Sequence, residues 1–343
     1  MKYAMLGNPE TRRLYIPHLI VAQSYNCNAA CIGCNVIRDD VNISSKEMKK
    51  LIDLWAEYCN RYDNGKGIFH LKGGEPFMFD GVWETLDYVV NKGLYLFITT
   101  NGTFVDKEAA KRLNELYKKT DGQVIVSLDG SNEEINDLSR PGLYKSAVKA
   151  IENLVNEGID AAWNYRIHKG NQNDVKNAVR MAKDLGVIQF NDLYHAKIRN
   201  RNGNLEIADL ETVLEQLEEL YDDGYKDLLE FSTEGIIRKV ASGKYTLMDC
   251  PLGYEGLKYI QPDGKETSCP NSVRINDINK VSRKYHGRLV CKGELYASTQ
   301  DPLYRKVLEK RENLIREKIS KLSSSRNQEK NQKAIAWCFS RNW

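Results

Sequence analysis

The stretch SYNCNAACIGCNV, residues 24–36, carries three of the chain's eight cysteines, Cys27, Cys31 and Cys34. It directly follows a short apolar run, LIVAQ (19–23), that reads as a buried strand. Disulfides need cysteines in pairs, and a closed tetrahedral zinc site needs four ligands. The spacing C-x3-C-x2-C lies between two known iron–sulfur spacings, C-x4-C-x2-C and C-x2-C-x2-C. The loop therefore predicts an iron–sulfur cluster with one coordination position left for another group.

Zinc is the alternative for the same three thiolates. A structural zinc site would need a fourth ligand close by, and none lies among the nearest residues. The histidines that could complete it, His18 and His70, are remote from the cysteine loop in sequence. The cluster with an open position is favoured.

Strand-like and helix-like segments alternate from residue 19 to about 200. Helices are expected from about Ser44 (a capping box with Glu47), at 81–93, 106–118, 143–157 and 173–185. The strand-like runs are LIVAQ (19–23), GIFHLKG (67–73), LYLFITT (94–100), QVIVSLDG (123–130), AAWNYRI (161–167) and VIQFNDLY (187–194). Such alternation predicts an α/β fold with a parallel sheet, either an open doubly wound sheet or a partial barrel. In both, ligands bind at the carboxyl ends of the strands.

Polar loops follow the predicted strands at that end: GGEP after the second, TNGT after the third and SLDG at the end of the fourth. The paired glycines Gly73 and Gly74 would let the main chain approach a ligand closely. The Glu75 carboxylate suits an ammonium group.

Composition excludes several classes of protein. The chain has 343 residues, 28% charged and 41% hydrophobic, with a formal net charge of +3, so neither a nucleic-acid nor a membrane partner is indicated. The N-terminus, MKYAMLGNPETRRLY, lacks an apolar signal core, and no apolar run approaches the roughly 18–20 residues of a membrane span. We therefore expect a cytoplasmic protein whose cysteines bind metal, act in catalysis or are buried.

The cysteine loop resembles the signature of radical S-adenosylmethionine (radical SAM) enzymes. In that family three cysteines hold a [4Fe–4S] cluster, and SAM chelates the fourth iron. The resemblance implies that Cys27, Cys31 and Cys34 bind this cluster, and that SAM is cleaved reductively to a 5′-deoxyadenosyl radical. It also implies a partial (β/α)6 TIM-like barrel.

The other loops resemble the family's remaining motifs in the expected order: KGGEP, TTNGT, SLDG and NDLSRPG, the last in place of the usual HDxxRG. Carried over residue by residue, they assign SAM contacts to Gly73, Gly74, Glu75, Pro76, Thr100, Asn101, Ser127, Asp129 and Arg140. Two positions depart from the family pattern: Gly33 replaces an aromatic residue, and Asn136 replaces the histidine, which leaves the role of Asn136 open.

Residues from about 248 resemble the auxiliary-cluster domain called SPASM, or its shorter form, twitch. The pattern is Cys250-x13-Gly264-x4-Cys269 around an IQPDG hairpin. Cys291 and Cys338 bring the total to four thiolates, which implies one auxiliary [4Fe–4S] cluster.

The expected domains are an N-terminal extension (1–18), the radical SAM partial barrel (19–204), a helical connection (205–247) and a small α+β auxiliary-cluster domain (248–343). The last includes a basic amphipathic helix at 301–322.

Family members with this layout mostly modify peptides or proteins by cross-linking, epimerisation or oxidation. The resemblance therefore implies hydrogen abstraction from a peptide, with a precursor peptide of a ribosomal natural product as substrate. Flavodoxin or ferredoxin would donate electrons, and a separate protein could bind the leader. A twitch-type dehydrogenase of a small molecule is one alternative, and a non-catalytic iron–sulfur or zinc protein is another.

Four residues are candidates for the chemistry on the substrate. Asp192, Tyr194 and His195 fall at a predicted strand end facing the presumed cavity, where any could act as a base on the substrate. Cys59 lies on the first helix beside Trp55 and is either a core residue or a hydrogen donor in an epimerase-like cycle.

Overall fold

The computed structural model describes residues 18–34, 36, 41–62, 66–194, 205–230, 232–235, 238, 257–264 and 266–267, together with single positions and short runs between 307 and 320. Cys250, Cys269, Cys291, Cys338 and His195 lie outside the described residues, and so does most of the predicted auxiliary domain.

One mixed sheet organises the described chain, in the order β6-β5-β4-β3-β2-β1-β7-β8. Its strands are β1 His18–Ala22, β2 Ile68–Lys72, β3 Tyr95–Thr100, β4 Gly122–Ser127, β5 Ala161–Ile167, β6 Gln189–Tyr194, β7 Leu257–Ile260 and β8 Glu266–Thr267. All neighbours from β6 to β7 are parallel, and β8 alone is antiparallel to its neighbour β7. The predicted α/β fold with a parallel sheet is confirmed.

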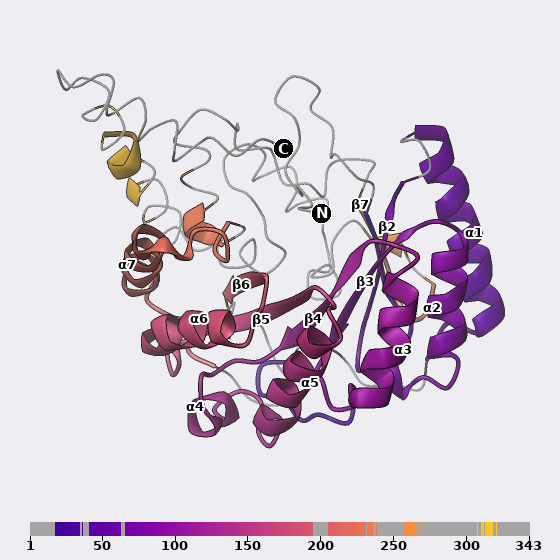
Figure 1. Cartoon of the computed structure of the whole chain (residues 1–343), viewed down its shortest axis with the longest axis horizontal. Helices are drawn as coiled ribbons and strands as arrows, with labels where there is room; N and C mark the ends of the chain where they lie inside the picture. The colour runs from indigo at the N-terminus through magenta and orange to yellow at the C-terminus, as the bar shows by residue number, and fades with distance from the viewer. Residues whose placement is uncertain are drawn as a thin grey trace.

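Helices connect the parallel strands and cover one face of the curved sheet (Figure 1). They are α1 Ser45–Tyr62, α2 Val82–Asn91, α3 Lys107–Tyr117, α4 Glu133–Asp137, α5 Tyr144–Asn156, α6 Val175–Asp184 and α7 Leu210–Leu220. Short turns of helix lie at Pro76–Met78 and Gln172–Asp174, and a wider π-helical turn follows α7 at Tyr221–Tyr225. None of the described helices has the length and hydropathy of a membrane span.

Local sequence signals set the helix ends. The capping box before α1 forms as expected, because the Glu47 N–H donates to Ser44 Oγ at 3.3 Å and the Ser44 N–H donates to the Glu47 carboxylate at 3.1 Å. Asp106 caps α3 through the Ala109 N–H at 2.8 Å. Gly93 follows α2 with φ +74°, the left-handed conformation that stops a helix. The short helix α4 was not expected from the sequence.

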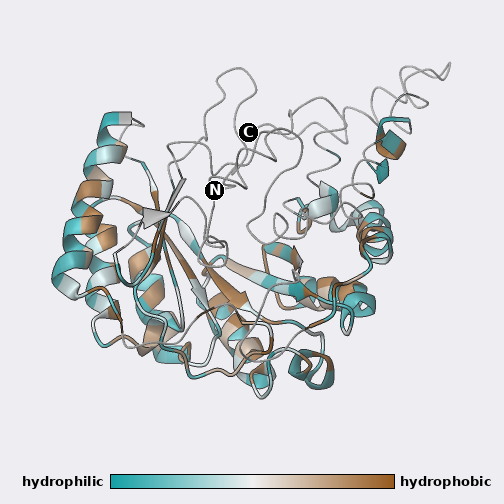
Figure 2. Cartoon of the chain, turned by 180° about the vertical axis from the view of Figure 1, so that it is seen from behind, coloured by the Kyte–Doolittle hydropathy of each residue, from teal (hydrophilic) through white to brown (hydrophobic). Residues whose placement is uncertain are grey.

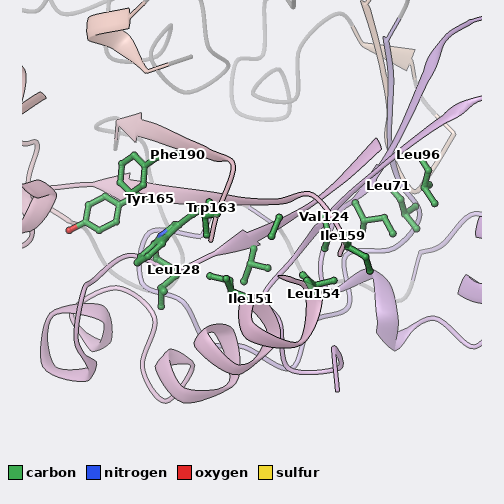
Figure 3. Close-up of a cluster of buried hydrophobic side chains, with 14 of the residues drawn as sticks. Leu71, Leu96, Val124, Leu128, Ile151, Leu154, Ile159, Trp163, Tyr165 and Phe190 are labelled. Carbon is green, nitrogen blue, oxygen red and sulfur yellow. The ribbon is translucent and has the colours of Figure 1, made fainter. Parts of the chain in front are cut away.

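The core lies between the sheet and these helices, on what we call the outer face of the sheet. Figure 3 shows part of it, with Trp163, Tyr165 and Phe190 packed beside Leu128 and Ile151. Helices in Figure 2 turn their apolar residues toward the strands and their polar residues outward. A separate, smaller cluster occupies the opposite, inner face: Ile68, Tyr95, Phe97, Ile125 and Ala162.

The IQPDG hairpin forms, with Tyr259 paired to Thr267 and Ile260 to Glu266. The Gly264 N–H donates to the Gln261 carbonyl at 2.9 Å, and Gly264 has φ +77°. Its strand β7 pairs in parallel with β1, so this part of the predicted auxiliary domain extends the barrel sheet.

Candidate active site

The cysteine loop leaves β1 and runs against the GGEP loop that follows β2. The Gly74 N–H donates to the Ser24 carbonyl at 2.9 Å, and the Glu75 N–H donates to the Asn26 carbonyl at 2.8 Å. A Cβ at Gly74 would lie 1.9 Å from the Asn26 carbonyl oxygen, so only glycine fits there. In the structure the close approach that Gly74 allows is therefore to the cysteine loop itself.

The Glu75 carboxylate connects the second and third strand-end loops. It accepts hydrogen bonds from Thr100 Oγ1 and the Asn101 N–H, both at 2.7 Å, and from the Phe77 N–H at 3.3 Å. Burial, at 3% exposure, raises the pKa of Glu75, and the three hydrogen bonds act against that rise. A buried carboxylate beside the cysteine loop suits a cationic ligand group.

Asn101, from the TNGT loop, reaches the cysteine loop directly. Its Nδ2 donates to Asn28 Oδ1 at 2.9 Å and lies 3.8 Å from Cys27 Sγ. Its Oδ1 accepts from the Thr103 N–H at 2.9 Å. The third strand-end loop is thus bonded to the first.

The fourth loop supplies a charged pair next to Cys31. Arg140 Nε lies 2.8 Å from Asp129 Oδ2, and Arg140 Nη1 lies 3.7 Å from Cys31 Sγ. Burial alone would lower the pKa of Arg140, but the Asp129 carboxylate and Cys31 outweigh it and raise that pKa, so the guanidinium stays charged. The Ile32 N–H donates to the Ser139 carbonyl at 2.8 Å, which ties the cysteine loop to the same turn.

The cysteine thiols are half-buried, and burial raises the pKa of Cys27 and of Cys31. The Arg140 guanidinium works against this rise at Cys31, and the Ala29 N–H does so at Cys27. A positive charge held beside a thiol favours the thiolate form that binds metal.

Arg166, at the carboxyl end of β5, is a site residue that the sequence reasoning missed. Its Nη1 donates to the Gly33 carbonyl at 3.0 Å, and its charge favours the Cys31 thiolate. Gly33 has φ +78°, a conformation that larger residues rarely adopt, so the expected aromatic residue would be strained here. Alternation along the predicted strand AAWNYRI (161–167) places Arg166 on the same face as Asn164, and this pattern was the sequence signal that could have found Arg166.

No three His, Cys, Asp or Glu side chains among the described residues converge on a single point as ligands of one metal ion would. One zinc ion requires all its ligands within about 2.0–2.3 Å. A four-iron cluster binds each thiolate at a different iron, so its cysteines need not converge. The loop with Cys27, Cys31 and Cys34 presents three thiols of the kind that such a cluster takes, and the Glu75 carboxylate and Arg140 guanidinium that lie beside it are opposite in charge to the ammonium and carboxylate of SAM.

Two further predicted SAM contacts lie at the same end of the sheet. Pro76 is buried at the start of the short helix after Glu75, and Ser127 ends β4 at 8% exposure. Their contacts with SAM, like those of the other assigned residues, stay predictions.

Two of the four candidate catalytic residues, Asp192 and Cys59, have side chains that the structure describes. Asp192 is fully buried on the outer face with Phe190, and both its carboxylate oxygens accept from the Thr233 N–H, at 3.0 and 3.1 Å. Cys59 is fully buried between α1 and the sheet, which favours its reading as a core residue. Tyr194 ends β6, and its side chain is outside the described part. Catalytic roles for these residues stay predictions.

The fold and the site together define a class: an α/β partial barrel whose strand-end loops converge on a cysteine loop suited to an iron–sulfur cluster. Residues 23–174 match the family described as the radical SAM superfamily, and this part of the chain is a radical SAM superfamily domain.

The chain is similar to several known proteins. It is 30% identical over 224 residues to Fe-coproporphyrin III synthase of Methanosarcina barkeri, covering 61% of this chain and 53% of the relative. It is 30% identical over 205 residues to mycofactocin maturase MftC of Mycolicibacterium smegmatis, covering 58% and 49%. AdoMet-dependent heme synthase of Methanosarcina barkeri is 27% identical over 277 residues, covering 74% and 76%.

The chain spans about half the length of the first two of these relatives. Among solved structures, Streptococcus suis SuiB bound to precursor peptide SuiA superposes with a TM-score of 0.57 at 16% identity, covering 77% of this chain and 62% of SuiB. This likeness is one of fold, and it confirms the partial barrel.

Proposed function

We propose that this protein is a radical SAM enzyme that abstracts hydrogen from a peptide or protein substrate, as in the maturation of a ribosomal peptide. One observation carries the proposal. The loops after β2, β3 and β4, and Arg166 at the end of β5, all bond to the loop that holds Cys27, Cys31 and Cys34. Such convergence would fix the cluster relative to the residues assigned to SAM.

The chain's own residues would divide the work as follows. Cys27, Cys31 and Cys34 would hold the [4Fe–4S] cluster, Glu75 would bind the SAM ammonium, and Arg140 would bind the SAM carboxylate. When bound and reduced, the cluster and SAM supply the 5′-deoxyadenosyl radical that abstracts hydrogen. The buried Asp129 keeps Arg140 charged and in place.

The proposal also includes an external electron donor, a leader-binding partner and an auxiliary cluster at Cys250, Cys269, Cys291 and Cys338. The names of two proteins support the peptide reading: one relative is a maturase, and the structural neighbour was solved with a precursor peptide.

A small-molecule substrate is the second candidate, because the AdoMet-dependent heme synthase matches about three quarters of both chains. Incubation of the enzyme with a deuterated cell extract, separated by size, would distinguish the two. Deuterium in 5′-deoxyadenosine would come from the peptide fraction in the first case and from the small-molecule fraction in the second.

The first test is anaerobic reconstitution with iron and sulfide, reduction with SAM, and detection of 5′-deoxyadenosine by mass spectrometry. We expect 5′-deoxyadenosine and about eight irons per chain, as two [4Fe–4S] clusters require. The variant with Cys27, Cys31 and Cys34 all changed to Ala should lose SAM cleavage and keep about four irons. Loss of all iron in that variant would contradict two separate cluster sites.

A further inference from the structure

The side-chain amide of Asn101, a buried residue in the loop after β3, uses all of its hydrogen-bonding capacity inside the protein. Its Oδ1 accepts from the Thr103 N–H at 2.9 Å and from Thr103 Oγ1 at 2.7 Å. Its Nδ2 donates to Asn28 Oδ1 at 2.9 Å and lies 3.8 Å from Cys27 Sγ, within reach of a hydrogen bond to sulfur. A carboxamide has two donor hydrogens and two acceptor lone pairs, so these four contacts leave none for a ligand.

One main-chain donor fixes the direction of every bond in this group. The Thr103 N–H can only donate, so the Asn101 atom that faces it is the oxygen, and the amide nitrogen lies on the other side. Asn28 must then present its oxygen to that nitrogen, and its own Nδ2 donates to Thr103 Oγ1 at 2.9 Å. The Thr103 hydroxyl in turn donates to Asn101 Oδ1, which closes a ring of three side chains. Within this ring the second N–H of the Asn101 amide is left for Cys27.

Asn101 also joins the cysteine loop to the Glu75 carboxylate. Its main-chain N–H donates to that carboxylate at 2.7 Å, while its side chain contacts Cys27 and the following residue, Asn28. A second side-chain nitrogen, Arg140 Nη1, lies 3.7 Å from a cysteine sulfur, but that guanidinium is charged and is assigned to the SAM carboxylate. The Asn101 amide is a neutral donor whose four contacts are all within the chain.

A hydrogen bond to a ligand sulfur changes the reduction potential of an iron–sulfur cluster. Reduction adds one electron and so increases the negative charge on the sulfurs. An N–H donor therefore stabilises the reduced form more than the oxidised form. A donor held at Cys27 would raise the potential and make the reduced form, which SAM cleavage requires, more accessible to an electron donor.

We propose that Asn101 tunes the reduction potential of the cluster through Cys27, and that Asn28 and Thr103 are positioning residues for its amide. This inference rests on the proposed function in one respect, that the cysteine loop holds a [4Fe–4S] cluster. It assigns the Asn101 side chain to the cluster, whereas the family resemblance assigns it to SAM.

The test is a redox titration of the reconstituted full-length protein without SAM, followed by electron paramagnetic resonance. The signal to follow is the one that later addition of SAM alters, which separates this cluster from an auxiliary one. In Asn101→Ala we expect the ratio of reduced to oxidised cluster at a given potential to fall about tenfold, a downward shift of about 59 mV for a one-electron couple. The main-chain N–H that bonds to Glu75 is retained in this variant.

Thr103→Val and Thr103→Ser test the ring without changing Asn101. Valine has the shape of threonine without the hydroxyl, so the amide loses one of the two donors that orient it. We expect Thr103→Val to lower the potential by less than Asn101→Ala does, and Thr103→Ser to keep the potential of the unchanged protein. This pair tests the inference even if Asn101→Ala does not fold.

Asn153→Ala is the matched control, because Asn153 is also a buried asparagine and holds the same loop. Its Nδ2 donates to the Val105 carbonyl at 2.9 Å. The variant should loosen the loop and leave the reduction potential of the cluster unchanged.

An unchanged potential in Asn101→Ala, or an equal shift in Asn153→Ala, would overturn the inference. A shift as large in Thr103→Ser as in Thr103→Val would overturn the positioning role of the hydroxyl. The expected shifts in a protein that abstracts hydrogen from no peptide would contradict the proposed function alone. The absence of any signal that responds to SAM in the unchanged protein would contradict both.

Discussion

Asn136 shows how a single carboxamide can order a charged site. It is fully buried, its Oδ1 accepts from the Asp129 N–H at 3.0 Å, and its Nδ2 donates to the Arg140 carbonyl at 2.9 Å. It thereby fixes the backbone at both members of the ion pair beside Cys31. An amide can do this because it carries an acceptor and a donor on one planar group. We assign it a positioning role at the place where the family pattern has histidine.

Asn136→Ala should leave the buried Asp129 N–H without the hydrogen bond it makes here, and should remove one of the two hydrogen bonds that the Arg140 carbonyl accepts. We expect it to lower the free energy of unfolding by about 1–3 kcal/mol and to weaken SAM binding about tenfold or more, measured by calorimetry. Asn153→Ala is the control, because Asn153 is also buried and donates to a backbone carbonyl, that of Val105, away from Arg140. Equal SAM affinity in the two variants would mean that Asn136 stabilises the fold without positioning Arg140.

At the scale of elements, a buried ion-pair network joins α7 to the C-terminal helical segment. Glu234 is fully buried and accepts from Arg311 Nε at 3.2 Å and Arg238 Nε at 2.7 Å. Arg311 Nη2 also lies 2.6 Å from Glu218 of α7. The basic helix predicted at 301–322 thus directs one of its charges inward, onto the protein itself.

Arg311→Met should destabilise the fold, because a buried carboxylate would lose one of its two cations. The expected loss is about 1–3 kcal/mol in the free energy of unfolding, measured by denaturant titration. The neighbouring Lys310 pairs with Glu211 in an exposed position, so Lys310→Met should have little effect. A similar loss in both variants would argue against a special role for the buried pair.

Across the whole molecule, sequence patterns predicted the structural features that depend on residues close together in the chain. Alternation and capping located the helices and strands, and the PDG turn located the β7–β8 hairpin. Contacts between residues far apart in the chain depend on how the strands pair, and sequence patterns did not predict them. Arg166 reaches Gly33 across 133 positions, and only the parallel pairing of β1 to β5 brings them together.

The same limit explains the catalytic candidates. Asp192 lies near the carboxyl end of β6, and alternation along that strand directs it with Phe190 toward the outer face rather than toward the presumed cavity. The sequence also gave no sign that β7 would pair with β1, because these strands are separated by most of the chain.

The buried histidines inside the barrel should make stability depend on pH. Burial, with the charge of Lys72, lowers the pKa of His18 to about 3 and holds that of His70 well below its usual range. In the unfolded chain a histidine takes up its proton near pH 6.5. Between pH 6.5 and about 3 the unfolded state therefore binds more protons than the folded state, and stability falls as the pH falls.

We expect the free energy of unfolding to be insensitive to these histidines above about pH 6.5 and to decrease below it, by about 1.4 kcal/mol per pH unit for each one. His18→Gln replaces the ring with a neutral amide, so the slope between pH 6 and 5 should decrease by about that amount for one histidine. Denaturant titrations at pH 7, 6 and 5 on the two proteins measure it. An unchanged slope in His18→Gln would show that His18 gains its proton in the folded protein as readily as in the unfolded chain, and that water reaches this buried ring.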